Sequence, residues 1–218
     1  MQLLSPQTTP VAALNSTVQQ KGYAVLSANS VAEWAGCALE ALRALSPDWD
    51  DMPPDNYLKD GGRYRRRLHS SFVFDNTTLT QVPHRAHWQP LDYNALHGGM
   101  ERWFEPMRAT TIDTPAWTKL LTAFAHTASG VRGTTPSKWC IEAHQFRIDT
   151  TDGIGRPTPE GAHRDGVDFV AVFMVNRVGI KGGETRVFDA NGPQGERFTL
   201  SEPWSLMLLD DTLSLIHI

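Results

Sequence analysis

The tripeptide His163-Arg164-Asp165 places an imidazole and a carboxylate two residues apart, between a segment rich in Gly and Pro and a short apolar run. Residues i and i+2 of an extended chain point to the same side, so both side chains can reach one ion. With a distant histidine they would form a two-His, one-carboxylate set, which leaves positions on Fe(II) for a cosubstrate and O2. The short pattern equally suits a surface turn, in which Asp165 accepts backbone N–H bonds and His163 faces solvent.

A basic cluster is the second candidate group, formed by Arg63, Arg65, Arg66 and Arg67. One guanidinium could clamp a substrate carboxylate in bidentate fashion, and we take Arg65, Arg66 and Arg67 as the substrate-binding candidates. Alternation along a strand would aim Arg65 and Arg67 one way and Arg66 the other. The alternative is a solvated strand or loop edge without a ligand.

Gln145 and Arg147 share one face of a predicted strand and are candidates for a cofactor pocket, although Arg147 could instead form a salt bridge. His144 faces the other way and is expected to be structural. The remaining histidines have no ligand spacing among themselves and are expected to be surface or core residues: His69, His84, His87, His97 and His126. Acidic residues that could hydrogen-bond to a metal ligand are Asp168 and the Asp210-Asp211 pair, for which a turn is also expected.

The first half of the sequence predicts mixed helix and strand. Lys21 to Ser27 ends in an apolar run that suits a strand. Ser30 and Glu33 have the form of a capping box, and apolar spacing continues the helix to Leu45. Thr114-Pro115 is predicted to open a second helix, with Gly130 as its stop.

The second half predicts short strands separated by turns rich in Gly and Pro, a spacing typical of a sandwich or barrel. The predicted strands are Lys138 to Asp149, Val167 to Val175, Glu184 to Asp189, Arg197 to Leu200 and Ser205 to Leu209. No Gly-rich element lies between a strand and a helix, which argues against a doubly wound nucleotide-binding fold.

Composition narrows the class of protein. The 218 residues carry a net charge of −4, which gives no general electrostatic case for nucleic-acid binding. No apolar run reaches the about 18–20 residues that span a bilayer, and the N-terminus lacks the pattern of a signal peptide. Cys37 and Cys140 cannot build a disulfide framework or a four-thiolate zinc site. We therefore expect one cytoplasmic domain, residues 1–218, without nucleic-acid or membrane partners.

Several longer sequence motifs accompany the His163-Arg164-Asp165 tripeptide. They are AHRDGVDFVAVFMVNR from Ala162, GGET from Gly182, LLDD from Leu208, DGGRYRR from Asp60, YN from Tyr93 with GG from Gly98, RWF from Arg102 and HQFR from His144. From about Tyr23 to Asp211, and in this order along the chain, the sequence resembles the bacterial 2OG-Fe dioxygenase family, which includes free L-amino acid hydroxylases such as L-isoleucine 4-hydroxylase.

The resemblance implies a mostly β protein with flanking helices, built as a double-stranded β-helix, or jelly roll. It implies Fe(II) held by His163 and Asp165, with 2-oxoglutarate as a cosubstrate that chelates the metal. In the implied reaction O2 is split. One oxygen atom enters succinate, and the other hydroxylates a C–H bond, or oxidises a thioether, of a small molecule such as a free amino acid.

The sequence departs from the family pattern at its C-terminal end. The pattern puts the third metal ligand at position 216, where this chain has Ile216, and His217 follows one residue later. A one-residue slip turns a strand side chain to the opposite face, so His217 would serve only if a bulge restored its direction. Leu213 to Ile218 also matches the translation of a transposase adapter used in sequencing libraries. We hypothesise that residues 213–218 are not native, and we expect a jelly roll that is incomplete at this end.

Three functions follow as hypotheses. The first is an Fe(II)- and 2-oxoglutarate-dependent dioxygenase acting on a free L-amino acid or similar small molecule. The second is a non-catalytic jelly-roll binding protein with a degenerate iron site. The third is a cupin-type metalloenzyme that does not use 2-oxoglutarate.

Overall fold

The computed structural model describes residues 4–58, 63–94, 98–134, 138–151, 153–155, 157, 161–190, 192 and 194–217. Contacts divide the chain into two compact units, Met1–Arg43 with Thr158–Ile218, and Ala44–Pro157. The prediction of a single domain stays a prediction. The candidates at Asp60 to Gly62 and at His97 lie outside the described residues.

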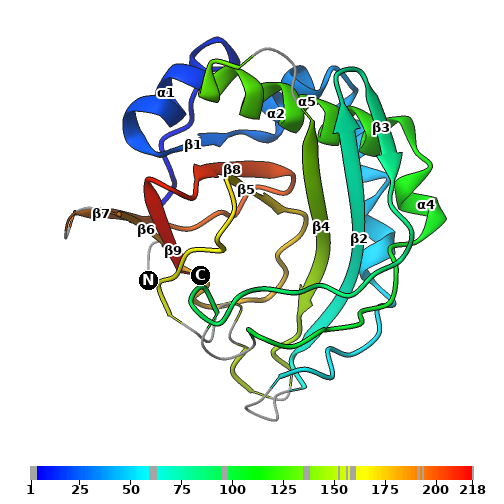
Figure 1. Cartoon of the computed structure of the whole chain (residues 1–218). Helices are drawn as coiled ribbons and strands as arrows, with labels where there is room; N and C mark the ends of the chain where they lie inside the picture. The colour runs from blue at the N-terminus through cyan, green and yellow to red at the C-terminus, as the bar shows by residue number, and fades with distance from the viewer. Residues whose placement is uncertain are drawn as a thin grey trace. The chain divides into compact units, whose positions relative to one another are not determined.

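Two three-stranded antiparallel sheets form the first unit, with strand orders β1-β8-β5 and β7-β6-β9 (Figure 1). The strands are β1 Tyr23–Leu26, β5 Phe169–Met174, β6 Thr185–Asp189, β7 Gly195–Phe198, β8 Ser205–Asp210 and β9 Ser214–His217. The helices are η1 Val11–Ala13, α1 Leu14–Lys21, α2 Ala28–Ala35 and α3 Leu39–Arg43. Each strand predicted from the second half of the sequence is present, with ends that differ by a few residues.

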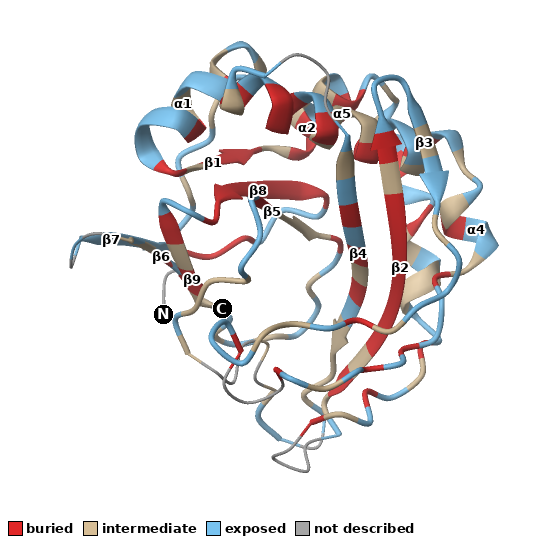
Figure 2. Ribbon diagram, viewed as in Figure 1, coloured by how far each residue is buried: buried red, intermediate tan, exposed pale blue. Residues whose placement is uncertain are grey.

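Both sheets of this unit contribute to one apolar core. Val25, Met207 and Leu209 enter it from the β1-β8-β5 sheet, and Val187 and Ile216 enter it from the β7-β6-β9 sheet. Strand β8 is buried along its whole length (Figure 2), which explains why its sequence is almost wholly apolar. Because side chains alternate along a strand, the positions of Val187 and Ile216 fix which residues of β6 and β9 face this core.

The second unit is built on one antiparallel sheet of order β3-β2-β4. Its elements are η2 Ser46–Trp49, β2 Arg65–Asp75, β3 Thr78–Gln81, α4 Ala109–Ile112, α5 Pro115–Arg132 and β4 Trp139–Ile148. Leu68, Phe72 and Ile141 lie on one face of the sheet and form a core with Leu121 and Ala125 of α5. The opposite face carries polar side chains.

Three helix ends differ from the sequence prediction. The cap of the first predicted helix is Ser27, whose hydroxyl accepts the N–H of Ser30, because β1 ends at Leu26 and the chain turns at once. Gly36 ends α2 in the left-handed conformation. Two short helices, α2 and α3, therefore replace the single helix that was predicted to continue to Leu45. Thr114 caps α5 as predicted, but the helix passes Gly130 and ends at Arg132, with Gly133 in the left-handed conformation.

The protein is mostly β with some helices, as the sequence predicts. Strand β9 pairs with β6 on one side, and on the other it forms a single bridge to His163. The closed jelly roll, and its incompleteness at the C-terminal end, stay predictions. In the described part of the chain, no helix has the length and apolar character that a bilayer crossing requires.

Gly22→Ala should destabilise the protein more than Gly36→Ala. Both glycines end a helix in the left-handed conformation, which costs an alanine about 1–2 kcal/mol. A Cβ at Gly22 would also overlap Ser214 Oγ and lie 3.1 Å from Leu213 Cβ, whereas nothing lies within 4 Å at Gly36. Urea unfolding of both variants measures the difference. Equal losses would show that the segment before β9 does not pack against Gly22.

Candidate functional site

Backbone and side-chain hydrogen bonds both fix His163 in the first unit. Its N–H and C=O pair with the C=O and N–H of Ile216 at 3.1 and 3.0 Å. Its ring Nδ1 lies 2.9 Å from the carbonyl oxygen of Gly161. A carbonyl only accepts, so Nδ1 carries the ring proton and Nε2 keeps its lone pair. Nε2 is therefore the atom of this ring that can bind a metal ion.

A buried carboxylate shapes the loop that follows. Asp211 accepts the backbone N–H groups of Asp165, Gly166 and Val167 at 3.1, 2.8 and 3.1 Å. Three bonds to one charged acceptor hold this backbone firmly. The supporting role suggested for the Asp210-Asp211 pair thus belongs to Asp211, while Asp210 accepts the N–H of Thr212 within the predicted turn.

The two predicted metal ligands converge. His163 Nε2 and Asp165 Oδ1 lie 3.7 Å apart, and both side chains are partly exposed. A metal ion binds such nitrogen and oxygen atoms at about 2.1 Å, which a pair at this separation can reach with a small adjustment. A neutral imidazole nitrogen with a carboxylate oxygen also suits Fe(II) chemically. The residues present therefore fit two of the three ligands of the predicted iron site.

Ile216 occupies the position opposite His163. The two residues exchange both backbone hydrogen bonds, and directly paired residues of antiparallel strands project their side chains to the same face. Ile216 is buried in the core of the unit. His217 pairs with Arg186 and, by alternation, points to the opposite face. The register therefore gives His217 no bulge that would turn it toward His163.

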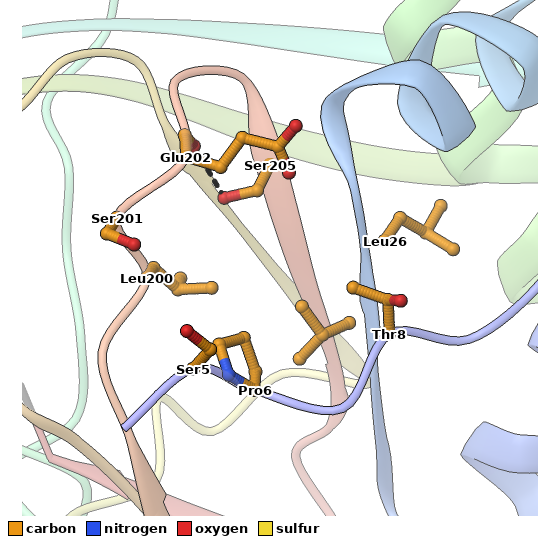
Figure 3. A pocket seen from close by; sticks show the side chains of 9 residues that line it. Ser5, Pro6, Thr8, Leu26, Leu200, Ser201, Glu202 and Ser205 are labelled. Carbon is orange, nitrogen blue, oxygen red and sulfur yellow. Dashed lines mark hydrogen bonds between the residues drawn. The ribbon is translucent and has the colours of Figure 1, made fainter. Parts of the chain in front are cut away.

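A surface cavity of about 140 Å³ lies elsewhere in the first unit (Figure 3). Its walls come from the N-terminal segment, β1, the segment of residues 200–202 and the first residue of β8, Ser205, which donates a hydrogen bond to the carbonyl of Glu202. Pockets for small ligands usually measure about 300–1,000 Å³. The cavity contains none of the predicted site residues, so we do not assign it to the functional site.

The arginine candidates of the second unit divide between the two faces of its sheet, as alternation predicts. Arg65 forms a buried ion pair with Asp55, whose Oδ2 lies 2.7 Å from its Nε. Arg66, on the face with the helix-packed core, donates to the carbonyl of Met52. Arg67 lies with its guanidinium 4.1 Å from the ring centre of Phe104 and 4.5 Å from that of Phe146.

Gln145 and Arg147 also share a face, as predicted, and it is the face with the helix-packed core. Gln145 is buried and donates to Thr111 Oγ1 at 3.3 Å. Arg147 donates to the carbonyls of Trp49 and Asp50, which lie at the end of η2. Both side chains therefore connect the sheet to the helical segments, and a cofactor role for them stays a prediction.

Four residues of the second unit form a group that the sequence pattern does not indicate. His69 of β2 pairs directly with His144 of β4, and Glu142 lies two residues before His144 on the same face. His87, from the loop after β3, completes the group. One donor atom from each residue lies within 4.8 Å of the others. The group thus contains His144, which was predicted to be structural, and His69 and His87, which were predicted to be scattered surface or core residues. Spacing along the sequence could not indicate it, because His69 and His144 pair across 75 positions.

Burial and charge set the ionisation of this group. Burial lowers the pKa of His69 to about 4, and it lowers the pKa values of His87 and His144, with Arg67 adding to the effect on His144. Burial alone would raise the pKa of Glu142, but the hydrogen bond from His87 and the contact with Arg85 hold it at about 2. At neutral pH the group therefore contains three neutral imidazoles and one carboxylate.

The family to which this chain belongs follows from a comparison with known protein families. The model of the 2OG-Fe dioxygenase family matches residues 46–217. The chain belongs to this family. Members of the 2OG-Fe dioxygenase family are oxidoreductases, and the family implies Fe(II), 2-oxoglutarate, O2 and a small-molecule substrate. The resemblance to the family is confirmed, whereas the amino-acid hydroxylase subgroup and the truncated C-terminus stay predictions.

Solved structures agree with the 2OG-Fe dioxygenase fold. A bsmA homologue from Methylobium petroleophilum PM1 is 48% identical with a TM-score of 0.91, and the match covers 100% of this chain and 87% of that chain. IDO from Bacillus thuringiensis is 14% identical, with a TM-score of 0.75 and coverages of 100% and 90%. The Fe(II)/α-ketoglutarate-dependent dioxygenase TqaL is 18% identical, with a TM-score of 0.65 and coverages of 94% and 77%. The last two comparisons show the fold alone. No curated protein matches the sequence.

Asp211→Asn should loosen the loop of His163 and Asp165. An amide cannot accept at both of its positions, so at least one of the three backbone N–H groups loses its charged acceptor. We expect a loss of about 2–3 kcal/mol in the free energy of unfolding, measured in urea. Glu202→Gln, which changes an exposed carboxylate of the same unit, serves as the control and should be neutral. Equal stability of the two variants would contradict the role of Asp211.

Proposed function

We propose that the protein is an Fe(II)- and 2-oxoglutarate-dependent dioxygenase that hydroxylates, or sulfoxidises, a free L-amino acid or similar small molecule. The observation that carries the proposal is the convergence of His163 Nε2 and Asp165 Oδ1 at 3.7 Å. It occurs within the segment that the 2OG-Fe dioxygenase family model matches. The proposal includes a single jelly-roll domain and a cytoplasmic location.

Under this proposal, Fe(II) binds to His163 and Asp165. Bound iron with 2-oxoglutarate supplies the oxidation, in which O2 and 2-oxoglutarate give succinate, CO2 and one oxygen atom for the substrate. The Gly161 carbonyl keeps the proton of His163 on Nδ1, so that Nε2 stays a ligand. Asp211 holds the backbone of Asp165 and so limits the movement of the second ligand.

Arg67 is the arginine that the contacts favour for a substrate carboxylate. Arg65 is already neutralised by Asp55 in a buried pair. Arg66 and Arg147 donate to backbone carbonyls on the face with the helix-packed core. Arg67 lies on the opposite face, between the rings of Phe104 and Phe146, and Phe146 is exposed. A planar guanidinium beside an exposed aromatic ring suits a small molecule with one carboxylate and an apolar side chain.

Arg67→Lys should raise the KM for the amino acid by about 10-fold or more with a smaller change in kcat. Lysine keeps the charge but loses the fork that grips both carboxylate oxygens. Steady-state kinetics on the substrate identified from an amino-acid panel measures the effect. Arg66→Lys provides the matched control on the opposite face and should leave KM unchanged. If KM changed in Arg66→Lys and not in Arg67→Lys, the substrate carboxylate would be assigned to Arg66 on the opposite face of the sheet.

A non-catalytic binding protein with a degenerate iron site is the second candidate function. The observation that favours it is Ile216, which occupies the place opposite His163 while His217 points to the other face. Two protein ligands bind iron more weakly than three, and an apolar residue at the third place donates nothing. This alternative keeps the fold and the small-molecule ligand but not the reaction.

Ile216→His separates the two functions. It would put an imidazole on the face of His163, so we expect tighter Fe(II) binding and more succinate released in the presence of 2-oxoglutarate and the amino-acid panel. His217→Ala should change neither quantity, because that side chain points away. His163→Ala or Asp165→Ala in the Ile216→His chain should abolish turnover. Turnover without 2-oxoglutarate would favour a cupin-type enzyme, and a folded Ile216→His chain without turnover would favour the binding protein.

A further inference from the structure

The four-residue group of the second unit has the composition of a transition-metal site. His69 and His87 are buried, His144 is partly buried, and Glu142 is the single acid. Glu142 Oε2 lies 2.5 Å from His87 Nδ1, 3.9 Å from His69 Nε2 and 3.9 Å from His144 Nε2. Three nitrogens from three different segments therefore surround one carboxylate oxygen. In a metal site the same atoms would lie about 3 Å or more from one another around the ion.

His69 is 1% exposed, and its Nε2 is the ring atom that faces Glu142. Ser71 Oγ lies 3.4 Å from the same Nε2, a long separation for a hydrogen bond. The Nδ1 atom has no hydrogen-bond partner among the described residues, but it is not the atom that faces Glu142 and does not mark the place of an ion. The rings also pack closely, since those of His69 and His144 are stacked at 4.6 Å and those of His87 and His144 meet at 4.7 Å. The three rings therefore lie close enough together for one nitrogen of each to reach a common ion.

The ligand atoms of the group suit a transition metal. Imidazole nitrogen and carboxylate oxygen both bind such ions, and one such atom from each of the four residues lies within 4.8 Å of the others. His87 Nδ1 donates to Glu142 Oε2 in a hydrogen bond of 2.5 Å. A cation that binds both atoms would need the ring proton of His87 to move to Nε2 and the two atoms to separate. Three nitrogens and one oxygen favour Zn²⁺, Co²⁺ or Ni²⁺ over the hard ions Mg²⁺ and Ca²⁺.

Arg67 opposes metal binding at His144. Its Nη2 lies 3.0 Å from His144 Nδ1, and a guanidinium only donates, so Nδ1 accepts and Nε2 carries the proton of the neutral ring. Nε2 can bind a metal only if this proton moves to Nδ1 and Arg67 withdraws. The positive charge of Arg67 adds a repulsion. Its removal should therefore strengthen the binding of a cation, which an ordinary hydrogen-bonded group would not do.

We propose that His69, His87, Glu142 and His144 bind one divalent transition-metal ion, as a site distinct in its ligands from His163 and Asp165. His69, His87 and Glu142 provide the minimal set, and His144 joins it when Arg67 moves away. The ligands all belong to the second unit, as does Arg67, which contacts His144 and is also the proposed substrate clamp. The metal site is tested by cation binding and does not require dioxygenase activity.

The test uses the full chain carrying His163→Ala, which removes one of the two iron ligands of the first unit. After chelator treatment, Co²⁺ is titrated while its visible d–d absorption and the heat of binding are recorded. We expect one Co²⁺ per chain with a nitrogen-containing ligand set, and no comparable binding of Mg²⁺. Adding His87→Gln or Glu142→Gln should weaken Co²⁺ binding by about 100-fold or more, since losing even a residue that only hydrogen-bonds to a ligand costs about 10–100-fold.

Matched variants separate ligand loss from unfolding. His126→Gln and Glu105→Gln change an exposed histidine and an exposed carboxylate of the same unit and should keep the Co²⁺ ion. Far-UV circular dichroism and the unfolding midpoint without metal identify any variant that does not fold. Arg67→Met, which keeps an apolar side chain between the two aromatic rings, should bind Co²⁺ more tightly than its parent.

Three results would overturn the proposal. One is the absence of bound Co²⁺ up to millimolar concentration in the folded His163→Ala chain. Another is unchanged Co²⁺ affinity in folded His87→Gln and Glu142→Gln variants. The third is weaker binding in folded Arg67→Met. None of these results bears on turnover at His163 and Asp165, which the Ile216→His experiment measures separately.

Discussion

The backbone pair between His163 and Ile216 is the constraint on which the predicted iron site depends. It joins the loop of the His-x-Asp motif to β9 by two hydrogen bonds between backbone groups. Side-chain direction then follows from the register alone. Whatever residue stands at position 216 faces the same side as His163, and the next residue faces away. The buried carboxylate of Asp211 completes the constraint by holding the backbone of Asp165.

The sheet of the second unit shows the same rule of alternation with a different result. One face of β2 and β4 carries apolar residues and packs against α5. The other face carries the arginine and histidine side chains that converge near Glu142. Since neighbouring residues alternate between these faces, a run such as Arg65 to Arg67 cannot act as one basic patch. Arg66 donates a hydrogen bond to the carbonyl of Met52 on the face that packs against α5, while Arg65 and Arg67 lie on the polar face.

The family places the protein among the 2OG-Fe dioxygenases, and the local chemistry qualifies that assignment. His163 and Asp165 have the donor atoms and the hydrogen-bonded support of metal ligands, but the third place holds an apolar core residue. In the second unit the donor atoms are sufficient in number, but a guanidinium lies beside one of them. Thus each group has one feature that weakens cation binding, and each feature is a single side chain.

The sequence by itself determined the strands of the second half, the opening of α5 at Thr114, and the metal motif with its one-residue slip at His217. Those features depend on local spacing, propensity and a period of two, which a linear pattern records. The end of α2 at Gly36 was missed because apolar spacing continues past it, although a glycine at this place is itself a helix stop signal. The group around Glu142 was decided only by tertiary structure. Its members come from two paired strands and a loop, and the register that joins them is set by the packing of the opposite, apolar face against α5.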